Sequence, residues 1–175
     1  GGQFIFVSNH FSYLDIPVLG LIPFDLVFIG KSSLAKVPLF GYMFKNLHIA
    51  VNRDSMKSRG ESILKARKAL DEGASVVFFP EGGISSHSPP AMARFKDGAF
   101  KLALDKQIPI IPVTLSYNHL ILPDDGKFLL RYKPVKVVIH EPIAVEGCGA
   151  NDVKELKRKC FAIIQDQLDK DNAQN

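Results

Sequence analysis

The chain has 175 residues, of which 46% are hydrophobic and 23% are charged, a composition typical of one globular domain with a sizeable core. Its formal net charge is +4 and its pI about 9.0, which favours acidic partners such as phosphorylated substrates, anionic lipid or an acidic carrier protein. It has two cysteines without a C-x-x-C pair and no tryptophan, which argues against a disulfide-bonded secreted domain, a structural zinc site and an aromatic nucleic-acid platform.

No stretch of the sequence predicts a transmembrane helix. The longest nearly uninterrupted apolar run covers residues 16–24, holds two prolines and ends at Asp25, well short of the ~20 residues that a spanning helix needs. The chain opens at Gly1 without a methionine and soon enters a predicted strand. We therefore expect that an N-terminal segment of the natural protein, which could hold a membrane anchor, is missing from this sequence.

Short apolar runs alternate with helical patterns, which predicts a single α/β domain with a mostly parallel mixed sheet flanked by helices. Gly73 follows an amphipathic segment as a C-cap glycine does. The predicted strands cover residues 4–7, 26–29, 47–51, 75–79 and 110–115, and a late antiparallel hairpin covers 128–132 and 135–140. The predicted helices cover residues 16–21, 58–72, 97–105 and 152–168, followed by a polar, frayed tail from 169.

Residues 8–15 place an imidazole and a carboxylate five positions apart, directly after an apolar strand. Five residues of an ideal helix turn through roughly 500°, so His10 and Asp15 meet only if the chain bends between them. A histidine held by a carboxylate keeps one tautomer and can take a proton from a hydroxyl at neutral pH. Ser12 and Asp15 also have the spacing of a helix capping box, although Pro17 would then fall inside the first helical turns.

Four segments in order resemble the motifs of the glycerolipid acyltransferases, specifically the 1-acylglycerol-3-phosphate (lysophosphatidic acid) acyltransferase family. The motifs are N-H-F-S-Y-L-D at 9–15, K-S-S-L with P-L-F-G and V-N-R within 31–53, F-P-E-G at 79–82, and I-P-I-I-P-V at 108–113. The resemblance covers residues from about 4 to 117. It implies an acyltransferase catalytic domain at residues 1–170, with 171–175 as a polar tail.

The resemblance implies transfer of a fatty acyl group from an acyl thioester to the sn-2 hydroxyl of 1-acylglycerol-3-phosphate, which gives phosphatidic acid. The donor would be acyl-CoA or acyl carrier protein, and neither a cofactor nor a metal is expected. His10 would be the general base, and Asp15 would fix its tautomer and stabilise the imidazolium. The sequence has no G-x-S-x-G elbow, so the substrate alcohol is expected to attack directly, without an acyl-enzyme.

Lys31 and Arg53 occupy positions at which the resemblance implies contact with the acceptor phosphate. Glu81, Gly82 and Gly83 belong to the third motif and are expected to bind substrate. Glycine has no Cβ, so backbone N–H groups near Gly82 and Gly83 could approach an anion closely.

One departure from the family pattern affects the acceptor. The family usually continues the third motif with Thr and Arg, where Gly83 and Ile84 stand in this chain. The phosphate therefore loses one expected cation, which Arg94 or Lys96 could replace.

The expected partners are a lysophospholipid, acyl-CoA or acyl carrier protein, and a membrane surface at the cytoplasmic face, with no nucleic acid. The apolar run over residues 37–44, flanked by lysines, could line the acyl groove or dip into the bilayer interface. Three alternatives stay open. They are a related acyltransferase with another acceptor (glycerol 3-phosphate, another lysophospholipid or an aminolipid), a hydrolase that uses the same His-Asp pair, and a non-catalytic lipid-binding domain.

Overall fold

The structure is a computed structural model that describes residues 2–31, 49–51, 55–84, 88–127 and 129–173. Within these residues the strands form one six-stranded sheet in the order β3-β2-β4-β1-β5-β6. The first five strands of the chain are parallel, and β6 runs antiparallel to β5, which confirms the predicted α/β domain with a mostly parallel sheet. The strands are β1 Ile5–Ser8, β2 Leu26–Lys31, β3 Ile49–Val51, β4 Ser75–Phe78, β5 Ile110–Leu115 and β6 Val137–Ile139.

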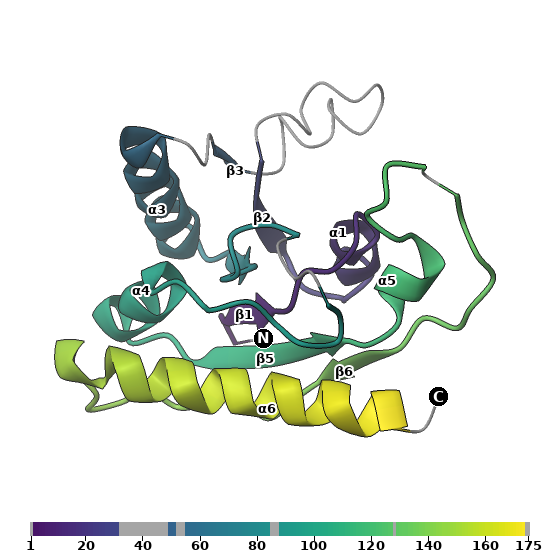
Figure 1. Cartoon of the computed structure of the whole chain (residues 1–175). Helices are drawn as coiled ribbons and strands as arrows, with labels where there is room; N and C mark the ends of the chain where they lie inside the picture. The colour runs from purple at the N-terminus through teal and green to yellow at the C-terminus, as the bar shows by residue number, and fades with distance from the viewer. Residues whose placement is uncertain (1, 32–48, 52–54, 85–87, 128, 174–175) are drawn as a thin grey trace.

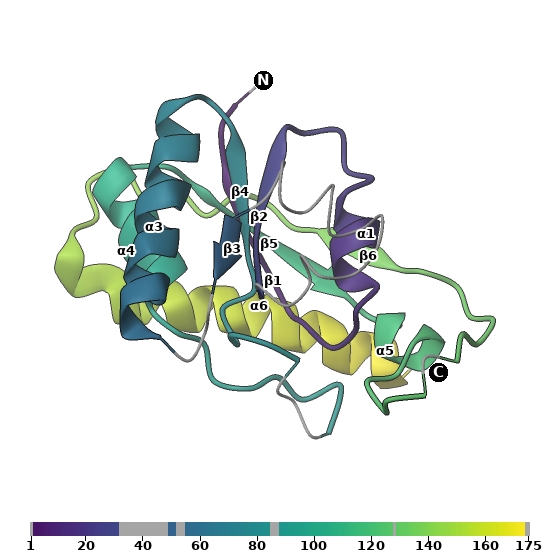
Figure 2. The same cartoon turned by 90° about the horizontal axis from the view of Figure 1, so that it is seen from above.

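Helices flank both faces of the sheet (Figures 1 and 2). The long helices α3, α4 and α6 cover one face, and the short helix α1 packs on the other. The N-cap of α3 is Ser55, whose hydroxyl accepts from the Ser58 amide at 3.2 Å, and Gly73 follows the helix with φ +92° as predicted. The helices are α1 Asp15–Leu19, α3 Met56–Asp71, α4 Gly98–Lys106, α5 Asn118–Ile121 and α6 Val153–Ala173, with a 3₁₀ turn at Ala150–Asp152.

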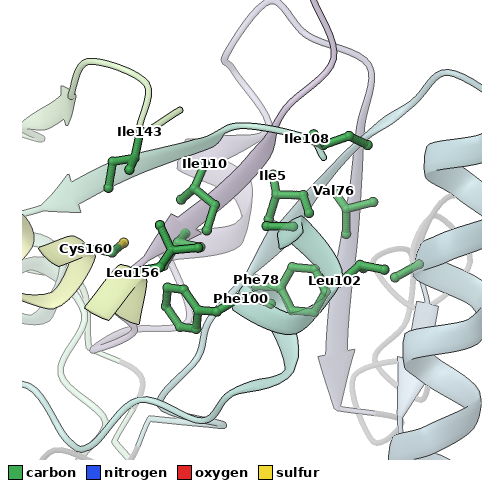
Figure 3. Close-up of a cluster of buried hydrophobic side chains, with 14 of the residues drawn as sticks. Ile5, Val76, Phe78, Phe100, Leu102, Ile108, Ile110, Ile143, Leu156 and Cys160 are labelled. Carbon is green, nitrogen blue, oxygen red and sulfur yellow. The ribbon is translucent and has the colours of Figure 1, made fainter. Parts of the chain in front are cut away.

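The central strands are buried on both faces, which explains their continuous apolar runs. Ile5 and Val7 of β1 point into the larger core cluster under α3, α4 and α6, while Phe6 between them points into the smaller cluster beside α1. Figure 3 shows part of the larger cluster, where Phe100 of α4 and Leu156 of α6 lie against the strands. The sheet therefore forms a rigid layer whose strand ends can hold a site.

The predicted late hairpin is wrong. The described residues 129–136 form no strand, and β6 instead pairs with β5, with Ile139 opposite Val113. The apolar run that suggested the first hairpin strand is not buried, since Leu129 and Leu130 are exposed. Apolar patterning indicates a strand only where the side chains have a core to enter.

The predicted polar tail is also wrong as far as residue 173, because α6 continues to Ala173. Asp171 is buried near its end, and its carboxylate accepts from the Ser116 hydroxyl and from Lys136 Nζ at 2.7 Å. These partners lie 55 and 35 positions away along the chain, so local sequence gave no sign of them. Among the described residues, no helix is long and apolar enough to cross a membrane.

Candidate active site

The three central strands β4, β1 and β5 end at one edge of the sheet, where each passes into a polar segment. β1 leads to Asn9 and His10, β4 leads to Glu81, and β5 leads to Asn118. The side-chain amide of Asn9 joins β5 to the segment after β1. Its Nδ2 donates to the Leu115 carbonyl and its Oδ1 accepts from the Leu115 backbone amide, each at 2.9 Å. Such a carboxyl edge is where open α/β sheets bind ligands.

The chain bends between His10 and Asp15, which is the condition under which residues at this spacing can meet, and the two side chains are in contact. His10 Nδ1 lies 2.9 Å from Asp15 Oδ2, and Asp15 is fully buried. The same oxygen accepts from the amides of Phe11 and Ser12 at 2.8 and 2.9 Å. The carboxylate therefore accepts from backbone amides just before the helix, as the capping alternative predicts, and it also holds the imidazole. Ser12 is not the N-cap itself. The N-cap of α1 is Leu14, which places Pro17 in the first turn, where proline is tolerated.

Asn118 completes the surroundings of Asp15, although the sequence did not point to it. Its Nδ2 donates to Asp15 Oδ1 at 2.9 Å, and its side chain is fully buried. The two residues are 103 positions apart. The only signal in the sequence was a polar segment directly after the buried strand β5. With the carboxylate ionised and held on both oxygens, His10 must donate from Nδ1, which leaves Nε2 as the basic nitrogen.

Two further contacts hold His10 in place. Its ring stacks on Phe79 with the ring centroids 4.2 Å apart and an interplanar angle of 24°. Its backbone amide donates to Glu81 Oε1 at 2.8 Å, and Glu81 Oε2 accepts from the Ala93 amide at 2.7 Å. The buried Glu81 therefore joins the segments after β1 and β4 and positions the backbone of His10. Its contact with substrate stays a prediction.

Burial raises the pKa of Glu81 from 4.5 to about 7, against the lowering effect of the amides of Ala93 and His10, and the charge of Asp15 adds to the rise. Between these values the native state holds a proton that the unfolded state has lost. The free energy of unfolding should therefore fall as the pH rises from about 4.5 to 7, by up to roughly 3 kcal/mol from this group.

We expect Glu81→Gln to flatten this dependence, because the amide does not titrate. Urea unfolding at pH 5 and pH 7.5 measures the effect, with the exposed Glu141→Gln as a matched control that keeps the wild-type slope. If Glu81→Gln kept the pH dependence of the unaltered chain, the fall in unfolding free energy could not be assigned to Glu81.

Gly82 brings the segment after Glu81 close to Lys96. Its amide donates to the Phe79 carbonyl at 3.0 Å, so this N–H is occupied within the turn. Anion binding by backbone N–H groups near Gly82 and Gly83 stays a prediction. Its φ is +85°, and a Cβ at this position would collide with Lys96 Nζ. The glycine thus leaves room for the side-chain amine of Lys96. The backbone of Lys96 is held by a 2.8 Å hydrogen bond from its amide to the Pro80 carbonyl.

A pocket of about 270 Å³ opens beside this lysine, between β4 and helices α3 and α4. Most of its described lining is apolar, and Lys96 and Ser62 are its polar members. It adjoins Phe79 and Pro80, on the segment that leads to Glu81. The described lining residues are Ile29, Ser62, Ile63, Phe78, Phe79, Pro80, Gly82, Lys96, Gly98 and Ala99.

Gly82→Ala should displace Lys96 as well as strain the backbone. Gly147 provides a matched control, since it has φ +76° and nothing within 4 Å of an added Cβ. Both variants should lose about 1 kcal/mol of stability or somewhat more, because alanine is strained at positive φ. Only Gly82→Ala should also raise the KM for an anionic acceptor, which steady-state kinetics on the two variants would measure. An equal KM in both would show that the Lys96 amine does not contact the acceptor.

The remaining predicted contacts lie partly outside the described residues. Lys31 ends β2, which neighbours β4 in the sheet, but its side chain is not described. Arg53 lies outside the described residues, as does the apolar run at 37–44. Arg94 is exposed on the segment that carries Ala93 and Lys96. Within the described part of the chain, no group of three or more His, Cys, Asp or Glu side chains could hold a metal ion.

Known proteins resemble this chain over most of its length. A family model described as Acyltransferase matches residues 1–116. A chloroplastic 1-acyl-sn-glycerol-3-phosphate acyltransferase of Brassica napus is 32% identical over 140 residues, which cover 79% of this chain and 40% of that protein. A 1-acyl-sn-glycerol-3-phosphate acyltransferase of Saccharomyces cerevisiae is 34% identical over 94% of this chain and 54% of its own length.

A solved structure is similar as well. The crystal structure of the 1-acyl-sn-glycerophosphate (LPA) acyltransferase PlsC from Thermotoga maritima matches with a TM-score of 0.78 and 25% identity, over 98% of this chain and 67% of that one. This chain spans only about two fifths of the length of the plant and algal relatives. The family model covers well over half of the chain and includes His10, Asp15 and Glu81. The chain therefore belongs to the acyltransferase family.

Proposed function

We propose that this chain transfers a fatty acyl group from an acyl thioester to the sn-2 hydroxyl of 1-acylglycerol-3-phosphate, which yields phosphatidic acid for phospholipid synthesis. The observation that carries the proposal is the buried His10–Asp15 pair at the carboxyl edge of the sheet, with Asn118 on the second oxygen of Asp15. The names of the relatives support the choice of lysophosphatidic acid as acceptor.

In this mechanism His10 Nε2 takes the proton of the acceptor hydroxyl as its oxygen attacks the thioester carbonyl. The tetrahedral intermediate then collapses, the carbon–sulfur bond breaks, and the thiolate leaves with the proton from the imidazolium. Asp15 stabilises the imidazolium between these two steps, and Asn118 holds the carboxylate in line with the ring. The proton that leaves the alcohol thus ends on the thiol, and no cofactor is required.

Lys96 is our candidate for a cation that faces the acceptor phosphate in place of the arginine absent at Ile84. It lines an apolar pocket, a combination that suits a substrate with an anionic head group and an aliphatic chain. Lys31, Arg53 and Arg94 are further candidates. The site would work at a membrane surface on its cytoplasmic face, with acyl-CoA or acyl carrier protein as donor.

An acceptor panel tests the proposal. Purified chain is supplied with a radiolabelled acyl-CoA or acyl carrier protein in mixed micelles, and each of several acceptors is added in turn: lysophosphatidic acid, glycerol 3-phosphate, and lysophospholipids with larger head groups. We expect labelled phosphatidic acid from lysophosphatidic acid. Transfer only to another acceptor would contradict the choice of lysophosphatidic acid as the acceptor. Release of free fatty acid at a rate that no acceptor raises would indicate a hydrolase instead.

A further inference from the structure

The segment between α5 and β6 exposes large apolar side chains, although it lies next to the site. We call Lys127 and residues 129–136 the basic apolar loop. Leu129, Leu130 and Tyr132 are 66%, 71% and 103% exposed. A single exposed leucine is ordinary, but three large apolar side chains within four positions form a local patch of the kind that marks an interaction surface.

Cations are interleaved with these apolar side chains. Lys127, Arg131 and Lys133 are exposed, and the segment from 127 to 136 contains no Asp or Glu. Their side chains can keep the charge among lipid head groups while neighbouring leucines enter the acyl boundary. Tyrosine favours the same depth, because its ring is apolar and its hydroxyl is polar. The pattern therefore suits an anionic lipid surface.

The middle and the C-terminal end of the loop are bonded to neighbouring elements of the fold. The Arg131 amide donates to the Ile121 carbonyl of α5 at 2.8 Å. At the C-terminal end, the Lys136 carbonyl accepts from the Ser116 amide at 3.2 Å, and Lys136 Nζ lies 2.7 Å from Asp171 Oδ1. In both views the loop projects beyond α5, away from α3 and α4 (Figures 1 and 2).

The catalytic turn touches the start of this segment directly. The Ser12 hydroxyl donates to the Leu122 carbonyl at 2.8 Å, and Ser12 also contacts Asp15 through its amide. A surface bound by the loop would therefore lie next to the turn that carries His10. The loop would hold the catalytic edge where a membrane lipid can reach it.

We propose that the basic apolar loop docks this chain on an anionic bilayer, with Leu129, Leu130 and Tyr132 inserted at the interface and the three cations among the head groups. The choice of a bilayer rests on the proposed function, because the acceptor and the product are lipids. An acidic carrier protein would be recognised mainly by charge, whereas this loop also exposes three large apolar side chains.

Sedimentation with vesicles of phosphatidylcholine and phosphatidylglycerol (70:30) tests the proposal. We expect Leu129→Ser/Leu130→Ser to weaken vesicle binding about tenfold or more. The triple variant Lys127→Gln/Arg131→Gln/Lys133→Gln should lose roughly fivefold per cation, or about 100-fold in all, and binding by the unaltered chain should weaken as salt is added.

Matched controls come from α3 and α6. Leu64 is 65% exposed on α3, so Leu64→Ser removes the same kind of exposed leucine elsewhere on the molecule. Lys65→Gln/Lys154→Gln/Lys159→Gln removes three exposed cations and causes the same change in net charge. Both controls should bind vesicles like the unaltered chain. Equal losses in the controls and the loop variants would overturn the proposal.

A fluorescent reporter locates the contact, because the chain has no tryptophan. In Leu130→Trp, emission should shift to the blue on vesicle addition and be quenched by brominated lipid, whereas in Leu64→Trp it should do neither. The proposal is overturned if Leu130→Trp does not respond, or if the unaltered chain does not bind. It is also overturned if Leu129→Ser/Leu130→Ser abolishes a dimer seen by ultracentrifugation while vesicle binding is unchanged, which would assign the loop to a second copy.

Transfer to a short-chain lysophosphatidic acid below its critical micelle concentration separates the two proposals. The loop variants should keep this transfer, because the monomeric acceptor needs no bilayer. If the unaltered chain lacks it, the proposed function fails, and vesicle binding still decides the proposal for the loop.

Discussion

Acyl transfer to lysophosphatidic acid is expected to fall by about 10²–10⁴-fold in kcat when His10 is replaced with alanine, the range that a positioned general base contributes. The reason is local: His10 carries the basic nitrogen Nε2, while its Nδ1 is held by Asp15 and its ring stacks on Phe79. Added imidazole should restore part of the rate, because it can occupy the vacated space and accept the same proton. The measurement is single-turnover transfer with and without imidazole.

The variant must be shown to be folded, since it removes a donor from a buried carboxylate. We expect a loss of about 1–3 kcal/mol in the free energy of unfolding, which urea titration measures. His140→Asn is a suitable control, because His140 Nε2 is hydrogen-bonded to the Thr114 hydroxyl and His140 takes no part in the site. Activity of folded His10→Ala within threefold of the unaltered chain would exclude His10 as the base.

Asn118 should be the second most sensitive position, because it is the donor to Asp15 Oδ1. Asn118→Leu removes a hydrogen bond to a charged group, worth about 1.5–3 kcal/mol, and so should lower kcat roughly 10–100-fold. The KM for both substrates should change little, because the contact of Asn118 is with Asp15 and its proposed role is to position that carboxylate. Steady-state kinetics with each substrate varied in turn measures this separation of kcat from KM.

Asn118→Asp distinguishes positioning of Asp15 from a general structural role. It places a second buried carboxyl beside Asp15, and the two cannot both ionise at this distance. While protonated, Asp at position 118 can still donate to Asp15 Oδ1, but once ionised it repels it. We therefore expect activity close to that of the unaltered chain at acidic pH and a steep loss toward alkaline pH.

Asn172→Asp is the control for Asn118→Asp, because Asn172 is exposed near the end of α6. It should leave the pH profile of transfer unchanged. If Asn118→Asp also leaves it unchanged, Asn118 has no part in positioning Asp15.

Much of the fold followed from local patterns. The strand at 110–115 was predicted with the bounds that the structure has, and the other parallel strands were placed to within a few residues. The central strands β1, β4 and β5 are buried on both faces, so their apolar runs are continuous and easily recognised. The later elements were harder, because Leu129 and Leu130 are apolar yet exposed, and Asp171 is polar yet buried.

The sequence by itself determined the α/β class, the parallel strands, and the His10–Asp15 pair, because these depend on residues close together in the chain. Only the tertiary structure decided that Asn118 faces Asp15 and that Glu81 positions the backbone of His10. These partners come from the ends of different strands, 103 and 71 positions away. The order of strands in the sheet brings them together, and no local propensity encodes that order.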